Sequence, residues 1–242
     1  MGSGPGTESR GREIPIDSGA RASRGTRASS LSVERARVAK LQAEERRAWA
    51  AGFRLVAGVD EVGRGCLAGP VYAGAVILGD YAPAGLDDSK ALLPEVREDL
   101  TRRIEANAVA TAVGAATPAE IDSLGIVAGT LLAMRRALAS LRVRPDHVLF
   151  DAVRLPGLEV PQLSFIRGDS SVAAIAAASV VAKTARDAFL ARLDARFPYY
   201  GFARHKGYAT TEHLQALRRH GPSPVHRLSF DRVLPCSGER AA

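Results

Sequence analysis

Two adjacent carboxylates stand at the end of an apolar stretch, just before a turn of glycine and arginine. Residues 56–59 read Val-Ala-Gly-Val, Asp60 and Glu61 follow, and Gly63-Arg64-Gly65 comes soon after. The apolar run predicts a buried strand whose end is marked by the glycines. Two acids at the mouth of a buried strand cost free energy unless a cation offsets their charge. Hard divalent ions such as Mg²⁺ take carboxylate oxygens, so the stretch predicts a metal site.

The Gly63-Arg64-Gly65 turn adds a second kind of chemistry. Glycines let backbone N–H groups come close to a ligand, and the arginine places a guanidinium among them. Taken alone, a Gly-x-Gly turn is more often a tight connection and nothing else. Beside two acids, it indicates contact with phosphate or sugar, and the two features together favour chemistry on a nucleic acid.

Two further acids occupy similar positions in the chain. Asp151 ends the apolar run 147–150, and Asp169 follows Gly168 after the stretch 163–167. Strand ends at one edge of an α/β sheet can converge in space, and ligands bind there. Any one of these aspartates alone is better explained as a turn or a cap. We therefore treat the acids as a candidate set and not as separate sites.

Geometry sets one difficulty for this set. Neighbouring residues on a strand point to opposite faces, so Asp60 and Glu61 cannot both face one metal from an ideal strand. The longer side chain of Glu61, or a break of the strand at Gly63, would resolve it. Three other aspartates are assigned structural roles, with Asp88 as a cap; they are Asp88, Asp122 and Asp187.

The stretch from Val56 to Gly65 closely resembles the signature of the type 2 ribonuclease H family, in particular its bacterial ribonuclease HII members. Further matches follow in the same order along residues 33–234. They are Asp88-Ser89-Lys90, Glu120-Ile121-Asp122, the strand ending at Asp151, Gly168-Asp169, Ala176-Ala177-Ala178-Ser179 with Ala182-Lys183 and Arg186-Asp187, His205-Lys206-Gly207-Tyr208, and His226-Arg227-Leu228-Ser229-Phe230. Several motifs in a fixed order make the resemblance specific.

The resemblance implies an enzyme with four acidic site residues. Asp60, Glu61, Asp151 and Asp169 would be the catalytic residues and also the ligands of Mg²⁺ or Mn²⁺ in a two-metal site. In such a site, two metal ions about 4 Å apart assist the attacking water and the leaving oxygen of a phosphodiester. The implied substrates are RNA–DNA hybrids and duplex DNA that contains ribonucleotides. Cleavage would fall 5′ to the ribonucleotide and leave 3′-hydroxyl and 5′-phosphate ends.

Reading the substrate requires contact with the 2′-hydroxyl, the group that separates RNA from DNA. The backbone amides of Gly63, Arg64 and Gly65 are the candidates for that contact. The resemblance implies that Tyr208 stacks beneath the nucleotide after the ribonucleotide; the alternative for Tyr208 is a core tyrosine.

Candidate phosphate contacts are the basic residues near these motifs, namely Arg64, Lys90, Lys183 and Lys206. Surface solvation is the alternative for each lysine, and for Lys183 the two interpretations carry equal weight.

The sequence departs from the family pattern at two positions. Ala152 stands after Asp151, where the family usually has glycine, and Cys66 stands where proline is frequent. We expect less backbone freedom at Ala152 and a packing role for Cys66. We expect no N-terminal substrate-binding domain of the ribonuclease HIII kind before the catalytic motifs, and this expectation favours ribonuclease HII over ribonuclease HIII.

Composition agrees with a nucleic-acid enzyme. Of the 242 residues, 46% are hydrophobic and 24% charged, as in globular proteins, and the net charge of +7 favours a polyanionic partner. We find no membrane-spanning apolar run and no secretory signal, so we expect no membrane partner. The two cysteines, Cys66 and Cys236, lie far apart and fit reduced thiols. We expect a cytoplasmic monomer.

The elements that must position these residues follow from periodicity and turn signals. Strands are expected at about 54–61, 70–78, 108–115, 147–151 and 162–166. Helices are expected at about 32–51, 94–106, 118–122, 126–141, 173–195 and 210–220. Strands that first pair and then alternate with helices predict an α/β fold with a mixed central sheet flanked by helices, which the resemblance makes ribonuclease H-like.

Three segments are expected along the chain. Residues 1–31 are rich in Gly, Ser and Arg and predict a disordered basic tail. Residues 32–197 predict the catalytic core, and residues 198–242 a small helical C-terminal subdomain with basic and aromatic side chains that binds substrate.

Two other functions remain open from the residues alone. One is another nuclease or strand-transfer enzyme of the same fold, which would act on all-DNA substrates. The other is a non-catalytic nucleic-acid-binding module, which would show salt-sensitive binding without cleavage.

Overall fold

The computed structural model describes residues 1–2, 32–86 and 89–234. The tail predicted for residues 1–31 lies outside these residues except for its first two positions. The cap predicted at Asp88 and the thiol of Cys236 also lie outside them. Among the helices of the described residues, none is both long enough and apolar enough to cross a bilayer.

A five-stranded mixed sheet forms the centre of the molecule, with strand order β3-β2-β1-β4-β5. The strands are β1 (Val56–Val62), β2 (Val71–Ile77), β3 (Ala110–Ala116), β4 (His147–Asp151) and β5 (Gln162–Phe165). β1, β2 and β3 pair antiparallel, whereas β4 joins β1 in parallel and β5 joins β4 in parallel. The predicted mixed sheet is therefore confirmed, and its parallel half brings the ends of β1 and β4 to one edge.

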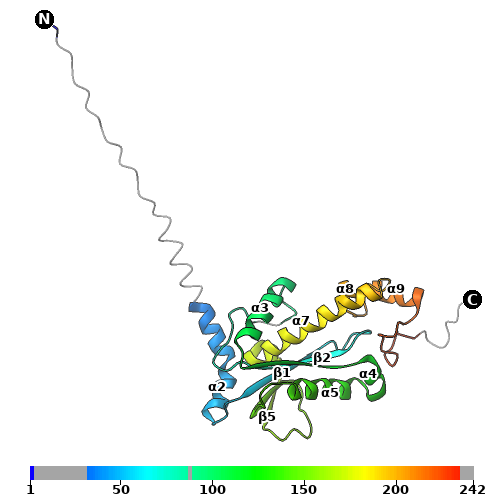
Figure 1. The fold of residues 1–242 in the computed structure, drawn as a ribbon, viewed down its shortest axis with the longest axis horizontal. Coiled ribbons are helices and arrows are strands. Elements are labelled where there is room, and N and C mark those ends of the chain that lie inside the picture. The colour runs from blue at the N-terminus through cyan, green and yellow to red at the C-terminus, as the bar shows by residue number, and fades with distance from the viewer. Residues whose placement is uncertain (3–31, 87–88, 235–242) are drawn as a thin grey trace, which may run out of the picture.

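Helices cover both faces of the sheet (Figure 1). One face packs against α7 (Ala173–Arg196), with α3 (Pro94–Asn107) beside it; the other packs against α5 (Ile126–Ala139), which follows α4 (Pro118–Leu124). The predicted helix over 32–51 is divided at Gln42 into a helix over 32–41 and α2 (Ala43–Ala50). Two short helices that were not predicted are α6 (Gly168–Ser171) and α8 (Phe202–His205).

α7 approaches the sheet closely because small residues face each other. A Cβ on Gly58 of β1 would lie 2.1 Å from the carbonyl carbon of Ala174, and one on Gly74 of β2 would lie 2.3 Å from the oxygen of Ala178. Alanine has the highest helix propensity, so a helix can be built of residues small enough for this packing. The close approach places Ser179 of α7 against the end of β1.

A carboxylate from α2 fixes the start of α7. The amide of Ala174 donates to Glu45 Oε1 at 2.6 Å, and Glu45 is buried. A negative charge at a helix N-terminus is favourable. Burial nevertheless raises the pKa of Glu45 to about 7.

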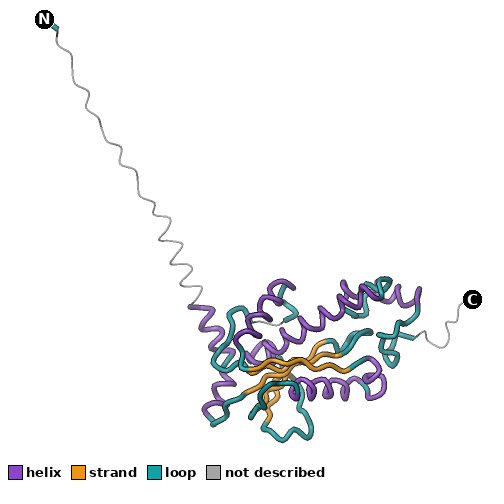
Figure 2. The backbone as a smooth tube through the Cα atoms, viewed as in Figure 1, coloured by secondary structure: helices purple, strands orange, loops and turns teal. Residues whose placement is uncertain are grey.

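The C-terminal part packs on the far end of α7. Phe202 of α8 and Leu217 of α9 (Thr211–His220) share an apolar cluster with Leu190 and Leu193 of α7. Figure 2 shows that loops make up much of the chain around and after α9. The division into a core over 32–197 and a subdomain from 198 stays a prediction.

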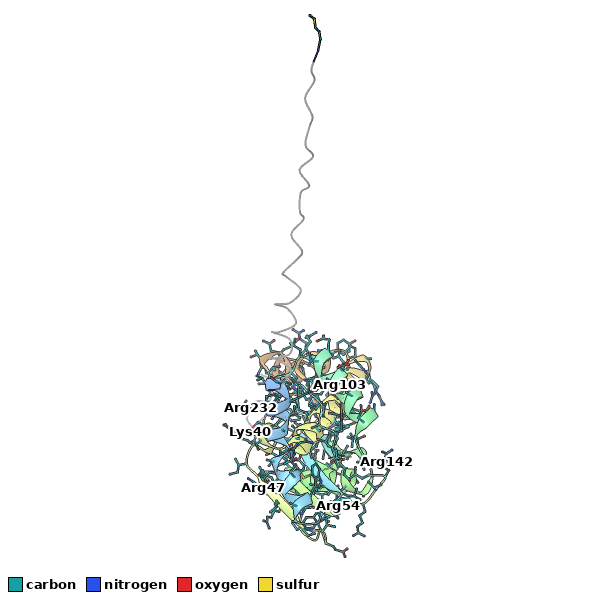
Figure 3. The ribbon with its side chains drawn as sticks, turned by 90° about the vertical axis from the view of Figure 1, so that its left-hand side faces the viewer. Lys40, Arg47, Arg54, Arg103, Arg142 and Arg232 are labelled. Carbon is teal, nitrogen blue, oxygen red and sulfur yellow. The ribbon has the colours of Figure 1, made fainter. Side chains whose placement is uncertain are left out.

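Positive charge is spread over the surface. Figure 3 labels basic residues from several elements, and they lie apart from one another; they are Lys40, Arg47, Arg54, Arg103, Arg142 and Arg232. A charge excess this dispersed does not mark a site, so the site must be found from its acids.

Candidate active site

The register of the parallel strands places two of the predicted acids side by side. Val59 of β1 pairs with Phe150 of β4, so the next residues, Asp60 and Asp151, are neighbours at the point where β4 ends and β1 continues to Val62. Paired residues on adjacent strands point to the same face. Both acids therefore point to the same side of the sheet at this edge.

Asp60 is the most deeply buried member of the set, with 4% of its surface exposed. Burial raises its pKa to about 8, and the nearby charges of Glu61 and Asp151 add to this. Its partners are the hydroxyl of Ser179 and the amide of Glu61, which donates to Oδ1 at 2.8 Å. A buried carboxylate crowded by other carboxylates holds its proton until a cation offsets the charge.

Glu61 lies within β1, because the strand continues to Val62 and does not break before Gly63. Its Oε1 accepts from Arg64 Nη1 at 3.1 Å, while its Oε2 is buried without a hydrogen-bond partner. Its pKa is raised by burial, with a smaller contribution from Asp151. The length of the glutamate thus brings its carboxylate within electrostatic reach of Asp151, and the strand break considered in the sequence analysis is not needed.

A sharp backbone turn brings Asp169 toward the same edge. Asp151 Oδ1 accepts from the amide of Gly168 at 2.7 Å, and Asp169 is the next residue, in α6. Asp169 is 8% exposed, and its Oδ2 lies 3.6 Å from Lys90 Nζ. Ala152, directly after Asp151, has a φ of 50° in the left-handed region. This conformation is the one that glycine adopts without strain, which explains the glycine usual in the family.

The donor chemistry of these acids fits a hard divalent cation. Carboxylate oxygens are the ligands that Mg²⁺ and Mn²⁺ prefer. The unpartnered Oε2 of Glu61 and the raised pKa of Asp60 are what a missing positive charge would produce. Within residues 32–86 and 89–234, no three Asp, Glu, His or Cys side chains already converge as a complete ligand set. Ion binding would therefore draw the carboxylates closer together.

Two serines that were not predicted as site residues support Asp60. The hydroxyls of Ser179 and Ser89 lie 2.8 Å apart and both residues are buried. Ser179 in turn interacts with Asp60, so the loop that carries Lys90 is tied to the acid through two hydroxyls. Both serines stand in motifs that the sequence analysis quoted, and that was the available signal.

Tyr208 lies beside the Gly-Arg-Gly turn. Tyr208 is 40% exposed, and its hydroxyl interacts with the thiol of the buried Cys66. Cys66 is the residue directly after the turn. The amide of Leu67 donates to the carbonyl of Gly207 at 2.8 Å, which joins the turn to the segment that carries Tyr208. The exposure of Tyr208 argues against the core-tyrosine alternative.

The three lysines have different surroundings. Lys90 lies within electrostatic reach of both Asp169 and Tyr208. Lys183 Nζ is 2.8 Å from Asp187 Oδ1, and its side chain is only 12% exposed. Lys206 lines a small pocket together with Asp187. Phosphate contact stays a prediction for all three, and the geometry favours Lys90.

Asp122 and Asp187 have the structural roles expected of them. Asp122 accepts from the amides of Leu228 and Ser229, each at 3.0 Å, and so fastens the C-terminal loop. Asp187 pairs with Arg97 and Lys183, each at 2.8 Å.

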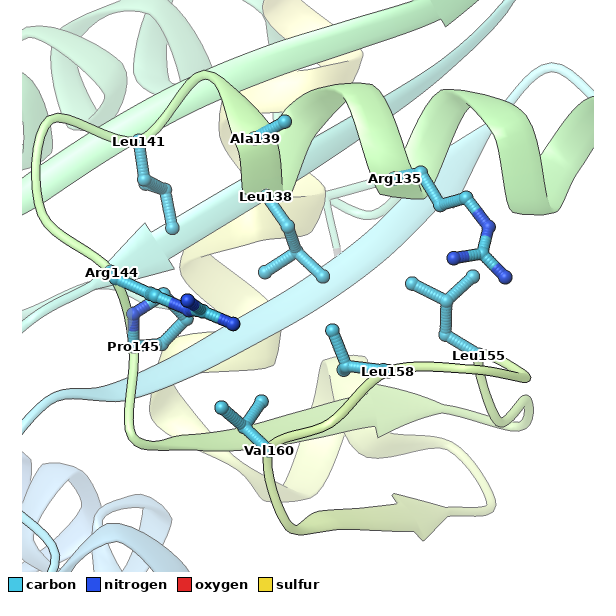
Figure 4. Close-up of a pocket in the computed structure, with 9 residues that line it drawn as sticks. All are labelled: Arg135, Leu138, Ala139, Leu141, Arg144, Pro145, Leu155, Leu158 and Val160. Atoms are coloured by element: carbon cyan, nitrogen blue, oxygen red, sulfur yellow. The ribbon is translucent and has the colours of Figure 1, made fainter.

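A cavity of about 460 Å³ lies elsewhere, between α5 and the connection from β4 to β5 (Figure 4). Leucines make up much of its wall, with Arg135 and Arg144 beside them. No predicted site residue lines it. The buried, coupled acids are the better evidence for a chemical site.

Comparisons with known proteins agree on one family. The family model described as Ribonuclease HII matches residues 57–233. The chain is 51% identical over 199 residues to the ribonuclease HII of Desulfitobacterium hafniense (strain DSM 10664 / DCB-2), a match that covers 82% of this chain and 76% of the relative.

Two solved structures share its fold. The ribonuclease H2 of Pyrococcus horikoshii OT3 is similar with a TM-score of 0.64 and 26% identity, over 74% of this chain and 94% of that one. Bst-RNase HIII, whose structure was solved in complex with Mn²⁺, has a TM-score of 0.62 at 18% identity, over 77% of this chain and 70% of that one. The second likeness concerns the fold alone.

Proposed function

The chain belongs to the ribonuclease HII family, and we propose that its buried acids are the site at which it hydrolyses the RNA strand of RNA–DNA hybrids. Members of this family are metal-dependent ribonucleases H, so the protein is an endoribonuclease. The proposal concerns which residues act, which ions they bind and where the cut falls.

One observation carries the assignment of residues. Asp60 is buried beside Glu61 and Asp151, and this crowding raises its pKa to about 8. Burying carboxylates side by side costs free energy, so the arrangement is uncommon where it serves no function. Groups whose pKa values are shifted in this way gather at functional sites. Asp169 completes the set through the turn at Gly168, which hydrogen-bonds to Asp151.

We assign Mg²⁺ or Mn²⁺ to these four carboxylates, in a two-metal site. When bound, such ions activate water and stabilise the charge of the leaving oxygen. Asp60 and Asp151 would hold the ions from the adjacent strands β1 and β4, and the unpartnered Oε2 of Glu61 offers a further ligand. Lys90, 3.6 Å from Asp169, would hold that carboxylate in place and face the phosphate backbone.

Selection of the ribonucleotide would come from the turn and the tyrosine. Arg64 and Gly65 are exposed, and their amides, which donate to no acceptor among the described residues, would be available to the 2′-hydroxyl and the adjoining phosphate. The half-exposed ring of Tyr208 offers a flat surface for the next sugar, which fits closely only if it lacks a 2′-hydroxyl. We therefore propose cleavage 5′ to a ribonucleotide embedded in duplex DNA, leaving 3′-hydroxyl and 5′-phosphate ends.

We also propose that the protein acts as a monomer in the cytoplasm, because a bacterial genome, its proposed substrate, lies there.

A duplex that contains one ribonucleotide tests the proposal. Incubation with Mg²⁺, and separately with Mn²⁺, should produce one nick 5′ to the ribonucleotide, while an all-DNA duplex stays intact. Cleavage of the all-DNA duplex would favour another nuclease or strand-transfer enzyme. Salt-sensitive binding without any metal-dependent nick would leave only a binding module.

A further inference from the structure

Two fully buried arginines lie directly beneath the Gly-Arg-Gly turn. Arg186 projects from α7 and Arg227 from the loop after α9, and both are 0% exposed. Neither forms an ion pair with a carboxylate of the described residues. Burying a guanidinium costs free energy unless its donors are satisfied, so their hydrogen bonds show what they are for.

Arg227 donates its hydrogen bonds to backbone carbonyls of the turn and of the segment after it. Nη2 donates to the carbonyl of Gly63 at 2.7 Å, Nη1 to that of Arg64 at 2.8 Å and Nε to that of Gly69 at 2.9 Å. A planar fork with fixed donors suits three such acceptors, and a lysine ammonium does not reproduce it.

Arg186 holds the same segment from the other side and connects it to the tyrosine. It donates to the carbonyls of Pro70 and Ala68 at 3.1 and 3.2 Å. Its third bond, at 3.0 Å, goes to the carbonyl of Lys206, two residues before Tyr208. One side chain therefore spans both proposed reading elements.

Peptide geometry gives these bonds a direction. In a trans peptide the N–H points opposite to the C=O of the same unit, and the chain has no cis bonds. When Arg227 draws the carbonyls of Gly63 and Arg64 inward, the amides of Arg64 and Gly65 must point outward. Both residues are exposed, and neither amide donates to an acceptor among the described residues.

We propose that Arg227, with Arg186 beside it, is a positioning residue that aims the amides of Arg64 and Gly65 at the ribose of the substrate. This inference rests on the proposed function and names the residues behind its specificity. Arg227 touches no substrate. The two buried positive charges also favour an electron-rich ligand at the outward amides.

The test uses the full chain carrying Arg227→Lys, which keeps the charge and removes the fork. Dissociation constants are measured in an Asp60→Asn background for a duplex with one ribonucleotide and for the same duplex in DNA alone. We expect the preference for the ribonucleotide duplex to fall about tenfold, the cost of one misdirected hydrogen bond, while affinity for the DNA duplex changes less than about twofold. An unchanged preference, or an equal loss on both duplexes, overturns the proposal.

Arg142→Lys is the matched control. Arg142 also donates to backbone carbonyls, at Val109 and Ala108, but far from the turn in the chain. Its replacement should leave the preference as it is. If Arg142→Lys lowers the preference as much as Arg227→Lys does, the effect is not specific to the turn and the proposal fails.

A second variant covers the case in which Arg227→Lys does not fold. Phe230→Leu removes the ring that stacks 5.1 Å from the Arg227 guanidinium and leaves every donor in place. The preference should then fall about threefold, with melting temperature as the folding check; no fall overturns the inference. If the parent protein itself shows no preference and no nicking, the proposed function fails first, which distinguishes the two failures.

Discussion

The guanidinium of Arg186 fills the space that a side chain on Gly63 would need. A Cβ built on Gly63 would lie 2.2 Å from Arg186 Nε, and the φ of Gly63 is 93°. Arg186 is fully buried and hydrogen-bonded, so it cannot move aside cheaply. The first glycine of the turn is thus required by the fold itself.

Gly63→Ala should therefore destabilise the protein by roughly 2–4 kcal/mol, since it combines a backbone penalty with overpacking. Urea unfolding measures the change. Gly65→Ala is the control, because Gly65 has open space around its Cβ position and no positive φ. It should leave stability within about 0.5 kcal/mol yet reduce ribonucleotide-specific cleavage, because a methyl group would then stand in the way of the sugar. Equal stability losses in the two variants would contradict this reading of the turn.

Replacing Asp60 by asparagine should stabilise the metal-free protein while removing cleavage. The pKa of Asp60 is raised from 3.8 to about 8 in the folded state. As pH rises between these values, the unfolded chain loses the proton first, so wild-type stability falls with pH. Asp60→Asn should therefore be more stable by roughly 2–3 kcal/mol above pH 8.

Thermal melting with and without Mg²⁺ separates an effect at the ion site from the effect of removing any carboxylate. Mg²⁺ should raise the melting temperature of the wild type and raise that of Asp60→Asn much less. Asp99→Asn, which changes an exposed carboxylate on α3, should respond as the wild type does. A metal response in Asp60→Asn as large as that of the wild type would remove Asp60 from the ion site.

The sequence was sufficient to place the strands and the acids, because apolar runs and glycine turns are local signals. It also predicted that Asp60 and Asp151 lie near each other at one edge of the sheet, and the parallel register of β1 and β4 makes them neighbours. It could not reveal that Glu61 reaches its neighbours from within β1, because this depends on side-chain length and not on pattern. The division of the N-terminal helix at Gln42 was equally invisible to periodicity.

The supporting contacts were harder to foresee. Arg186 and Arg227 are charged residues in motifs that carry the family resemblance, and nothing local indicates that both are buried. Most of their partners are backbone carbonyls from segments more than a hundred residues away in the chain, and Lys206 is the exception. Every residue carries a backbone carbonyl, so the sequence does not indicate which carbonyls accept from these arginines. Only the fold reveals these hydrogen bonds.

Removing the ring of Tyr208 should affect one kind of substrate more than the other. Tyr208→Ala should reduce cleavage at a single ribonucleotide about tenfold, the value of one stacking contact, and cleavage of long hybrids much less. Tyr208→Phe should stay close to the wild type, because it keeps the ring and loses only the contact with Cys66. Steady-state rates on both substrates measure this. Tyr199→Ala, which removes an exposed ring stacked on His220, is the control; equal losses for Tyr199→Ala and Tyr208→Ala would count against a specific role.

A chain of buried histidines should make the protein sensitive to acid. The amide of Ser223 donates to His226 Nδ1, so His226 Nε2 carries the proton and donates to His213 Nε2 at 2.9 Å. His213 Nδ1 then donates to the carbonyl of Tyr208 at 2.8 Å. Burial lowers the pKa of both histidines to about 4.

Because these pKa values lie below 6.5, the unfolded chain takes up protons first as pH falls. The contribution of these two histidines to the free energy of unfolding should therefore be fully present above about pH 6.5 and be lost progressively toward pH 4. His226→Gln should weaken the protein at pH 7 and make the dependence on pH shallower, as followed by urea midpoints from pH 7 to pH 5. The exposed His220 provides the comparison: His220→Gln should keep the wild-type slope, and a wild-type slope in His226→Gln would refute the role of the chain.

The turn after Asp151 should be improved by the glycine that it lacks. Ala152 has a φ of 50°, where a Cβ costs roughly 1–2 kcal/mol. Glycine removes that cost, but it loses more conformational freedom on folding, which opposes folding by roughly 0.5–1 kcal/mol. The difference predicts that Ala152→Gly stabilises the protein by about 0.5 kcal/mol or slightly more. Ala191→Gly, at an exposed position in α7, should instead destabilise it by about 1 kcal/mol. Urea unfolding of the two variants beside the wild type gives the sign of each change in the free energy of unfolding. A loss in Ala152→Gly as large as that in Ala191→Gly would mean that the left-handed backbone next to Asp151 carries no strain.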